Sequence, residues 1–523
     1  MLKRREFIRQ AGTATFLTMM GHREGRAVGD SKREKQRPLP NIVIIYADDL
    51  GYGDVACYNS QSKVQTPNLN KLAERGIRFT DAHSPSTVCT PSRYSLLTGR
   101  MCFRTGLRGV FTGVDGPLIE KGRLTLAQLL QDHGYATACI GKWHVGMTFL
   151  KPDGQPVTPR GGGIKKVRQV DFRKPIQDGP VDVGFDYFFG TACCPTTDWL
   201  YAYIENNRFV EAPTELTSPK TTHWLEYEHF RTGLKARNFD FRNVELVFLD
   251  KSEKFLKNHI RQQPQKPFFL YHSTQAVHLP AMPAPQFVGT TPAGPLGDFI
   301  YEFDDIVGRL MKTLETLGVA DNTLVIVTSD NGPEIVVTQM QEQFGHDSAS
   351  PWRGFKRDNW EGGHRVPLIA CWPGKIRPGS VTDQTVCQTD LLATFAAIVG
   401  AKLPEDAGED SFNILPAFLG EQQDRPIRDY TLHQTIRNAL SIRHGPWKLL
   451  AHKGSGGNRY DDTYLKSFEI ADTDPEAPGQ LYNLSTDPRE QHNLYSQYPE
   501  IAAEMKRKLE FFQSSGRSAP LSR

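Results

Sequence analysis

Acidic and amide side chains directly follow two strongly apolar segments of the sequence. Asp48 and Asp49 come after the β-branched run at 42–47, and Asp330 and Asn331 follow a second such run. If the two runs are neighbouring strands, three carboxylates converge, and a dry site can hold them only with a cation, because like charges repel or take up protons. Carboxylate and amide oxygens select a hard divalent ion, and a set without an octahedral cage favours Ca²⁺ over Mg²⁺. The alternative is two ordinary turns, since Asp, Asn and Gly are common turn residues.

A cysteine, Cys89, stands where a helix is expected to begin. The segment 89–100 has a proline in its first turn and a glycine near its end, which predicts a short helix. The free N–H groups of a helix N-terminus attract an anion, and Arg93 adds a positive charge one turn later. This environment suits a reactive thiolate or the binding of a tetrahedral oxyanion. Because Ser95 stands six residues after Cys89, the cysteine phosphatase pattern Cys-x5-Arg is absent, and a buried structural thiol is an equally good interpretation.

Strand and helix signals alternate along the chain from Asn41 onward. The strand segments are continuous apolar runs, which are typical of parallel strands buried on both faces of a sheet. We therefore predict an α/β fold with a mostly parallel central sheet and helices on both faces. Functional groups in such folds gather beyond the carboxyl ends of the strands. The predicted strands are 42–47, 135–140, 268–271, 324–327 and 366–369, and the predicted helices are 66–76, 125–134 and 300–317.

Composition narrows the class of protein. The chain has 523 residues, 38% of them hydrophobic and 23% charged, with a net charge of +3. These values indicate a large globular protein and argue against a basic nucleic-acid binder and an acidic disordered chain. No run of 18 apolar residues is present, which excludes a membrane-spanning helix. Eight cysteines are too few for a disulfide-built scaffold, and their spacing indicates no pairing.

Three regions are expected along the chain. Residues 1–37 begin with a basic Arg-Arg-x-Phe-Ile segment and a short apolar run, which predicts a twin-arginine-like export signal and linker; a disordered basic tail is the alternative. Export would place the protein in a bacterial periplasm or outside the cell. Residues 38–415 are expected to form the catalytic domain. Residues 416–523 are expected to form a smaller α+β domain with an antiparallel sheet and a terminal helix at 499–512.

The segment Cys89-Thr90-Pro91-Ser92-Arg93, followed by Leu96-Leu97-Thr98-Gly99-Arg100, resembles the signature of the type I sulfatases of the alkaline phosphatase superfamily. Resemblance to this family, including its exported bacterial arylsulfatase-like members, extends over roughly residues 40–510. It implies that a formylglycine-generating maturation enzyme oxidises Cys89 to formylglycine, whose hydrate is the nucleophile. The other matching segments, in order, are 47–54, 66–69, 141–144, 277–280, 329–332, 353–356, 360–367, 481–484 and 487–490.

The resemblance also implies a role for each matching residue. A calcium ion would be held by the formylglycine from Cys89 and by Asp48, Asp49, Asp330 and Asn331. Arg93 and Lys142 would orient the hydrated aldehyde, Asp330 would take the proton of the attacking hydroxyl, and His144 would remove the second proton to expel sulfate. Lys142, His278 and Lys356 would bind the substrate, with His278 as the acid for the leaving alcohol. His364 occupies a position that the family fills variably, and His272, His346 and His364 are left as candidates for a supporting shell or the substrate pocket.

The substrate implied is a sulfated carbohydrate or an aryl sulfate. Residues 150–240 are rich in glycine, cations and aromatic side chains, which would suit a sulfated sugar but could equally form a packed surface loop. Two other functions stay open. Relatives with the same nucleophile are phosphodiesterases or phosphonate monoester hydrolases, and an unmatured cysteine would leave a non-catalytic binder of sulfated glycans.

Overall fold

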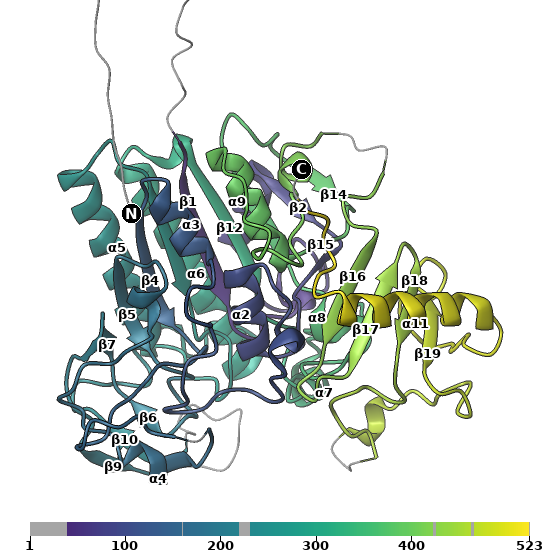
Figure 1. Cartoon of the computed structure of the whole chain (residues 1–523), viewed down its shortest axis with the longest axis horizontal. Coiled ribbons are helices and arrows are strands. Elements are labelled where there is room, and N and C mark those ends of the chain that lie inside the picture. The colour runs from purple at the N-terminus through teal and green to yellow at the C-terminus, as the bar shows by residue number, and fades with distance from the viewer. Residues whose placement is uncertain (1–38, 159, 219–230, 422–424, 462–464, 522–523) are drawn as a thin grey trace, which may run out of the picture. The chain divides into compact units, whose positions relative to one another are not determined.

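A large mixed sheet, parallel at its centre, forms the middle of the described chain (Figure 1). The structure is a computed structural model and describes residues 39–158, 160–218, 231–421, 425–461 and 465–521. The predicted export signal at 1–37 lies outside these residues. Among the described residues, ten strands pair in the order β14-β2-β13-β12-β1-β11-β4-β5-β7-β8. The α/β architecture predicted from the alternating signals is confirmed.

The five central strands are parallel to one another. They are β12 (Thr323–Ser329), β1 (Asn41–Ala47), β11 (Phe268–Ser273), β4 (Ala136–Lys142) and β5 (Tyr187–Thr191). The flanking strands are β14 (Ser380–Thr382), β2 (Ile77–Phe79), β13 (Leu368–Cys371), β7 (Ile204–Glu205) and β8 (Arg208–Phe209). The segment at 366–369, placed by its sequence in the same series, becomes β13, which runs antiparallel to β12. Every residue of β1 and β12 is buried, as their continuous apolar sequences require.

Helices cover both faces of this sheet (Figure 1). On one face α6 (Gly294–Thr316) contacts α1 (Pro67–Arg75) and α5 (Val244–Gln262), and on the other α9 (Leu391–Val399) contacts α2 (Cys89–Thr98) and α3 (Leu126–Asp132). The predicted apolar face of α6 is buried from Phe303 to Leu314. The helix begins at Gly294, before the predicted start at residue 300. Proline in the first turn of α1 and Gly76 after its end fit its predicted boundaries.

The C-terminal region contains the predicted antiparallel sheet. Its strands are β16 (Tyr430–Gln434), β17 (Leu440–His444), β18 (Trp447–Leu450) and β19 (Gln480–Asn483), and α11 (Pro499–Ser514) packs against them. Met505, Leu509 and Phe512 of α11 are buried in a cluster with residues of this sheet. The remaining helices are α4 (Gly163–Val167), α7 (Val337–Phe344), α8 (Glu361–His364) and α10 (Leu415–Phe418), and the remaining strands are β3 (Ala82–His83), β6 (Leu200–Tyr201), β9 (Glu215–Thr217), β10 (Gly233–Lys235) and β15 (Val386–Cys387). Short 3₁₀ helices lie at Tyr52–Asp54, Cys102–Thr105, Pro180–Asp182, Pro285–Phe287, Ala320–Asn322, Gln388–Asp390 and Lys466–Phe468.

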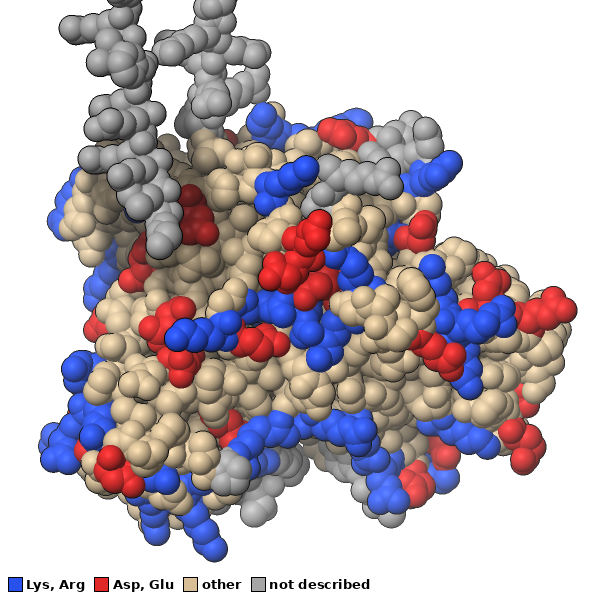
Figure 2. All heavy atoms as spheres, in the orientation of Figure 1, with Lys and Arg blue, Asp and Glu red and all other residues tan. Residues whose placement is uncertain are grey.

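Aromatic side chains of the segment 150–240, where the structure describes them, pack against other side chains. Tyr201 and Tyr203 are buried, and Tyr203 lies 5.3 Å from the ring of Phe189 and 4.8 Å from that of Phe239. For these two tyrosines the packed-loop interpretation therefore holds. Charges of both signs are interspersed over the face shown in Figure 2, as the small net charge leads one to expect. No helix in the described part of the chain is both long and apolar enough to cross a membrane.

Three histidines lie buried between the central sheet region and the C-terminal sheet. They are His83 of β3, His364 of α8 and His433 of β16. His83 Nδ1 lies 3.0 Å from His364 Nδ1, and the rings of His364 and His433 stack at 3.7 Å. Lys448 Nζ donates to His364 Nε2 at 3.0 Å, and His83 Nε2 lies 2.9 Å from Asp81 Oδ1. Hydrogen bonds thus connect the Lys448 ammonium to the Asp81 carboxylate through the imidazole rings of His364 and His83.

The buried histidines make stability depend on pH. Burial first, and then the neighbouring histidines and Lys448, hold the pKa values of His364 and His433 well below the usual 6.5. The folded state therefore binds fewer protons than the unfolded chain, and stability that is complete above pH 6.5 is lost as the pH falls. We expect about 1 kcal/mol of unfolding free energy to be lost per histidine between pH 6.5 and 5.5. Denaturant unfolding at several pH values measures this slope.

The matched variants are His433→Gln and His492→Gln, because His492 has an exposed side chain. Removing His433 should reduce the pH dependence of the unfolding free energy by the contribution of one buried histidine, whereas removing His492 should leave it unchanged. Equal slopes in the two variants would show that His433 does not titrate as a buried neutral group.

Candidate active site

The carboxyl ends of the central strands bring the predicted residues together. Asp48 and Asp49 follow β1, Asp330 and Asn331 follow the neighbouring strand β12, and Lys142 ends β4. Carboxylate oxygens of Asp48, Asp49 and Asp330 lie within 4.8 Å of one another. The neighbouring-strand condition on which the sequence argument depended is met, and the turn interpretation does not account for this convergence of buried acids.

Each acid of this cluster is matched by a buried cation. Lys142 Nζ donates to Asp48 Oδ2, Lys356 Nζ donates to Asp49 Oδ2 at 2.7 Å, and Arg93 donates to Asp330 Oδ2 at 2.7 and 3.0 Å. Arg93 Nη2 also lies 3.7 Å from Asp48 Oδ2. Arg93 is positioned further by Ser273 of β11, which accepts from its Nη1. The fully buried Arg93 therefore links the strands β1, β12 and β11.

Two oxygens in the cluster lack a hydrogen-bond partner among the described residues. They are Asp48 Oδ1 and Asn331 Oδ1, both buried. Asn331 Nδ2 donates to Asp49 Oδ1 at 2.7 Å, which aligns the amide with the carboxylates. Orphaned acceptors beside three carboxylates are the donor set of a hard divalent cation. The residues present therefore fit a calcium site.

The ionisation of the acids is coupled. Burial alone would raise the pKa of Asp48, but the charges of Lys142, His278, Arg93 and Lys356 together outweigh burial and hold that pKa well below the usual range. Burial and then the Asp48 charge raise the pKa of Asp330 to about 8. On protein contacts alone the Asp330 carboxyl is therefore harder to ionise than an ordinary aspartate, and a cation at the cluster would favour its ionised form.

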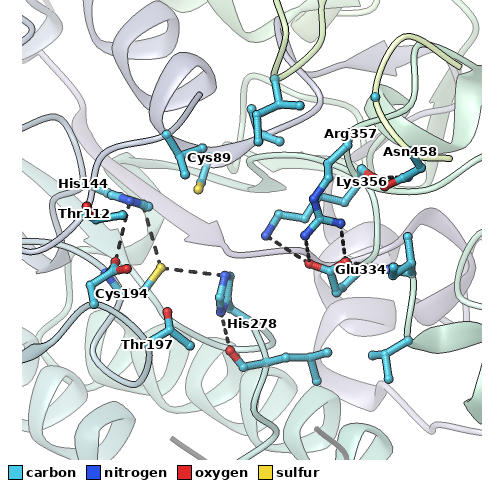
Figure 3. A pocket seen from close by; sticks show the side chains of 18 of the residues that line it. Cys89, Thr112, His144, Cys194, Thr197, His278, Glu334, Lys356, Arg357 and Asn458 are labelled. Carbon is cyan, nitrogen blue, oxygen red and sulfur yellow. Dashed lines mark hydrogen bonds and ion pairs between the residues drawn. The ribbon is translucent and has the colours of Figure 1, made fainter. Parts of the chain in front are cut away.

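Cys89 begins helix α2 and lines a cavity of about 800 Å³. His144, His278 and Lys356 also line this cavity, and Figure 3 shows Cys89, His144 and Cys194 across from Lys356 and Arg357. Burial would raise the pKa of the Cys89 thiol, but His144 and Lys142 lower it to about 6. The predicted anion-attracting environment of Cys89 is therefore present.

The two histidines of the cavity are held by backbone carbonyls. His144 Nε2 lies 2.8 Å from Phe111 O, and His278 Nδ1 lies 2.6 Å from Leu279 O. Burial lowers the pKa of His278, whereas the negative charges of the neighbouring Asp48 and Asp49 carboxylates raise it. His144 and Asp49 both have φ near +60°, a conformation uncommon outside glycine that concentrates at functional sites.

Several cavity residues were missed from the sequence. Glu334 and Arg357 form an ion pair at 2.5 Å beside Lys356, whose Nζ lies 3.7 Å from Glu334 Oε2. Both lie close in sequence to predicted site residues, Asn331 and Lys356, and this could have marked them as candidates. No sequence signal marks the other missed residues, which reach the cavity from loops distant in sequence: Phe111, Cys194, Asp198, Arg231, Asn458 and Arg459.

The unassigned histidines do not reach the cavity. His272 bonds to Ser252 Oγ at 2.8 Å, His346 to Asp54 Oδ1 at 2.8 Å, and His364 belongs to the buried chain described above. None of the three is among the residues that line the cavity, so the substrate-pocket alternative is wrong for them, and a supporting role stays a prediction.

A buried nucleophile position, matched cations and a cavity at the carboxyl edge of an α/β sheet define a hydrolase with an alkaline phosphatase-like fold that acts on an anionic ester. A family model described as sulfatase matches residues 40–401, and one described as the C-terminal region of N-sulphoglucosamine sulphohydrolase matches residues 352–515. The chain belongs to the sulfatase family and is a sulfuric ester hydrolase.

Curated relatives and solved structures match nearly the whole chain. N-acetylgalactosamine-6-O-sulfatase of Bacteroides thetaiotaomicron is 33% identical, covering 92% of this chain and 94% of the relative. Arylsulfatase A of Homo sapiens is 34% identical, covering 87% and 83% respectively. A solved structure from work on glycosaminoglycan metabolism by Bacteroides thetaiotaomicron has a TM-score of 0.77 at 31% identity, covering 91% of this chain and all of its own.

The buried Lys142–Asp48 pair should support the fold in the absence of calcium. Lys142→Met leaves Asp48 with only the more distant Arg93, so the unfolding free energy of calcium-free protein should fall by about 3–5 kcal/mol. Lys254→Met breaks an exposed pair with Asp250 and should cost less than about 1 kcal/mol. Denaturant titration compares them, and equal losses would contradict a structural role for the buried pair.

Proposed function

We propose that this sulfatase hydrolyses the sulfate ester of a carbohydrate, using a formylglycine made from Cys89 and a bound calcium ion. The observation that carries the proposal is that Cys89 lines one cavity with His144, His278 and Lys356, and that Lys356 also donates to Asp49 of the buried acid cluster. Sulfate transfer spreads negative charge over several oxygens, and positioned cations stabilise that charge. The alternative of a buried structural thiol does not explain this surrounding charge.

The side chains divide the work of binding and proton transfer. Lys142, Lys356 and His278 bind the sulfate group, and His278, which lines the cavity, supplies the proton to the departing alcohol. Arg93 and Lys142 orient the group at position 89. His144, with Nε2 committed to Phe111 O, keeps Nδ1 free to accept a proton from it. Asp330 is the acceptor for the proton of the attacking hydroxyl.

The groups absent from the structure supply complementary chemistry. Formylglycine offers a hydrated aldehyde, which allows sulfate to leave by elimination rather than by hydrolysis of a stable ester. Asp48, Asp49, Asp330 and Asn331, together with the group at position 89, would hold calcium, which acts as a Lewis acid on sulfate oxygen. Calcium is proposed over Mg²⁺ because the oxygens form no octahedral cage.

The substrate class rests on the cavity and on the relatives. One of these relatives is named an N-acetylgalactosamine-6-O-sulfatase. The cavity, at about 800 Å³, has room for sugar rings, and Arg231, Arg459 and Asn458 offer charge and hydrogen bonds to them. A sulfated carbohydrate is therefore proposed, with aryl sulfates as simpler substrates.

Maturation, export and domain division complete the proposal. A formylglycine-generating enzyme would act on the segment around Cys89, and residues 1–37 would direct the product to a bacterial periplasm or out of the cell. The division at 415/416 places all four strands of the C-terminal sheet in the second domain, which would contribute Asn458 and Arg459 to the cavity.

The experiment combines mass spectrometry with paired substrates. In protein made with a maturation enzyme, the tryptic peptide Phe79–Arg93 should show the Cys89 sulfur replaced by an aldehyde oxygen. That protein should release sulfate from an aryl sulfate and a 6-sulfated amino sugar, and Cys89→Ala should lose at least about a thousandfold in kcat/KM, as is usual for a nucleophile.

The control is Cys102→Ala, which removes another buried thiol that lies outside the cavity lining. It should retain turnover wherever it folds. Faster hydrolysis of the matching phosphodiester would instead assign a phosphodiesterase, and an intact thiol with glycan binding but no turnover would assign a non-catalytic binder.

A further inference from the structure

A second thiol faces the cavity beside Cys89. Of the eight cysteines, all of them free, only Cys89 and Cys194 line the cavity. Cys194 Sγ lies 3.7 Å from His278 Nε2 and 4.0 Å from His144 Nδ1 (Figure 3). The proposed hydrolysis uses both histidines but gives the Cys194 thiol no task.

Both imidazoles present their remaining nitrogen to this sulfur. A carbonyl oxygen only accepts hydrogen bonds, so the nitrogen of His278 bonded to Leu279 O and that of His144 bonded to Phe111 O must each carry the proton. The nitrogen left for another ligand is then Nε2 of His278 and Nδ1 of His144, the atoms nearest Cys194. Metal-binding histidines are typically oriented in this way, by donating their second N–H to a carbonyl.

We propose that Cys194, His278 and Asp48 form a site for a thiophilic divalent cation such as Zn²⁺ or Cd²⁺. One ligand atom from each lies within 4.8 Å of the other two, and Asp48 Oδ1 has no partner among the described residues. Zinc–sulfur and zinc–nitrogen bonds of about 2.3 and 2.0 Å in tetrahedral geometry place sulfur and nitrogen about 3.5 Å apart. The observed separation of 3.7 Å between Cys194 and His278 fits this value.

This site shares Asp48 with the oxygen cluster, and its other donors distinguish the ion that it would bind. Thiolate and imidazole favour zinc-like ions, whereas calcium takes oxygen ligands. Binding releases two protons to solvent, one from the Cys194 thiol and one from His278 Nε2, the atom that would otherwise protonate the leaving alcohol. A thiophilic ion is therefore an inhibitor of hydrolysis, and this consequence rests on the proposed function, whereas the binding itself does not.

The binding test uses Cd²⁺ and its charge-transfer absorption with thiolate, in a Cys89→Ser background that leaves Cys194 as the cavity thiol. Calcium-free protein should bind one equivalent of Cd²⁺ with this absorption, and the double variant Cys89→Ser/Cys194→Ser should lose it. The matched control is Cys89→Ser/Cys193→Ser, because Cys193 Sγ faces Gly113 O at 3.7 Å and lies outside the cavity lining.

The control should keep the absorption unchanged. Loss with Cys193→Ser would overturn the proposal in favour of the group His144, Cys193 and Asp198, whose ligand atoms also lie within 4.8 Å of one another. Absorption that persists without Cys194, or is absent from the Cys89→Ser protein, would also overturn it.

The functional test is inhibition of sulfate release by Zn²⁺ in matured protein. Measured against its own rate without added Zn²⁺, the Cys194→Ser variant should need at least tenfold more Zn²⁺ for half inhibition than the unaltered chain, and equal sensitivity would contradict the site. If the unaltered chain releases no sulfate, the proposed function fails, while the Cd²⁺ titration still decides whether the metal site exists.

Discussion

The burial of three carboxylates at one edge of the sheet is the constraint on which the rest of the site depends. Asp48, Asp49 and Asp330 have no access to solvent that would screen their repulsion. Each carboxylate accepts a hydrogen bond from one buried cation (Lys142, Lys356 or Arg93), and the pKa of Asp330 is still raised above its usual value. The remaining demand for positive charge is what makes the cluster a cation site, and the same cations surround the place where a sulfate ester must enter.

The parallel sheet satisfies this constraint by geometry. β1, β12, β11 and β4 are adjacent, so groups that follow them meet at one edge although Asp49 and Asn331 are 282 positions apart in the sequence. The apolar strands exclude water beneath the acids, and helix α2 contributes Cys89 and Arg93 to the site. Stability and chemistry are therefore coupled, because the buried pairs that hold the loops in place are also the groups that hold the substrate.

Much of this arrangement could be predicted from the sequence, because it follows from strand ends. The continuous apolar runs predicted the strands, and the acids directly after two of them predicted their convergence. The antiparallel direction of β13 could not be predicted, since an apolar run carries no direction. Cys194, Arg231 and Asn458 escaped notice because tertiary packing of loops, and no local pattern, brings them to the cavity. The same packing turned Tyr201 and Tyr203 inward.

The most direct test of the central claim is the calcium content of matured protein before and after chelation, measured together with sulfate release. The account predicts one calcium ion per chain, loss of turnover when it is removed, recovery with Ca²⁺ in preference to Mg²⁺, and no ion retained by Asp49→Asn/Asn331→Ala. Full turnover by a protein free of divalent cations would contradict it, because the buried acids would then need no cation beyond the protein's own.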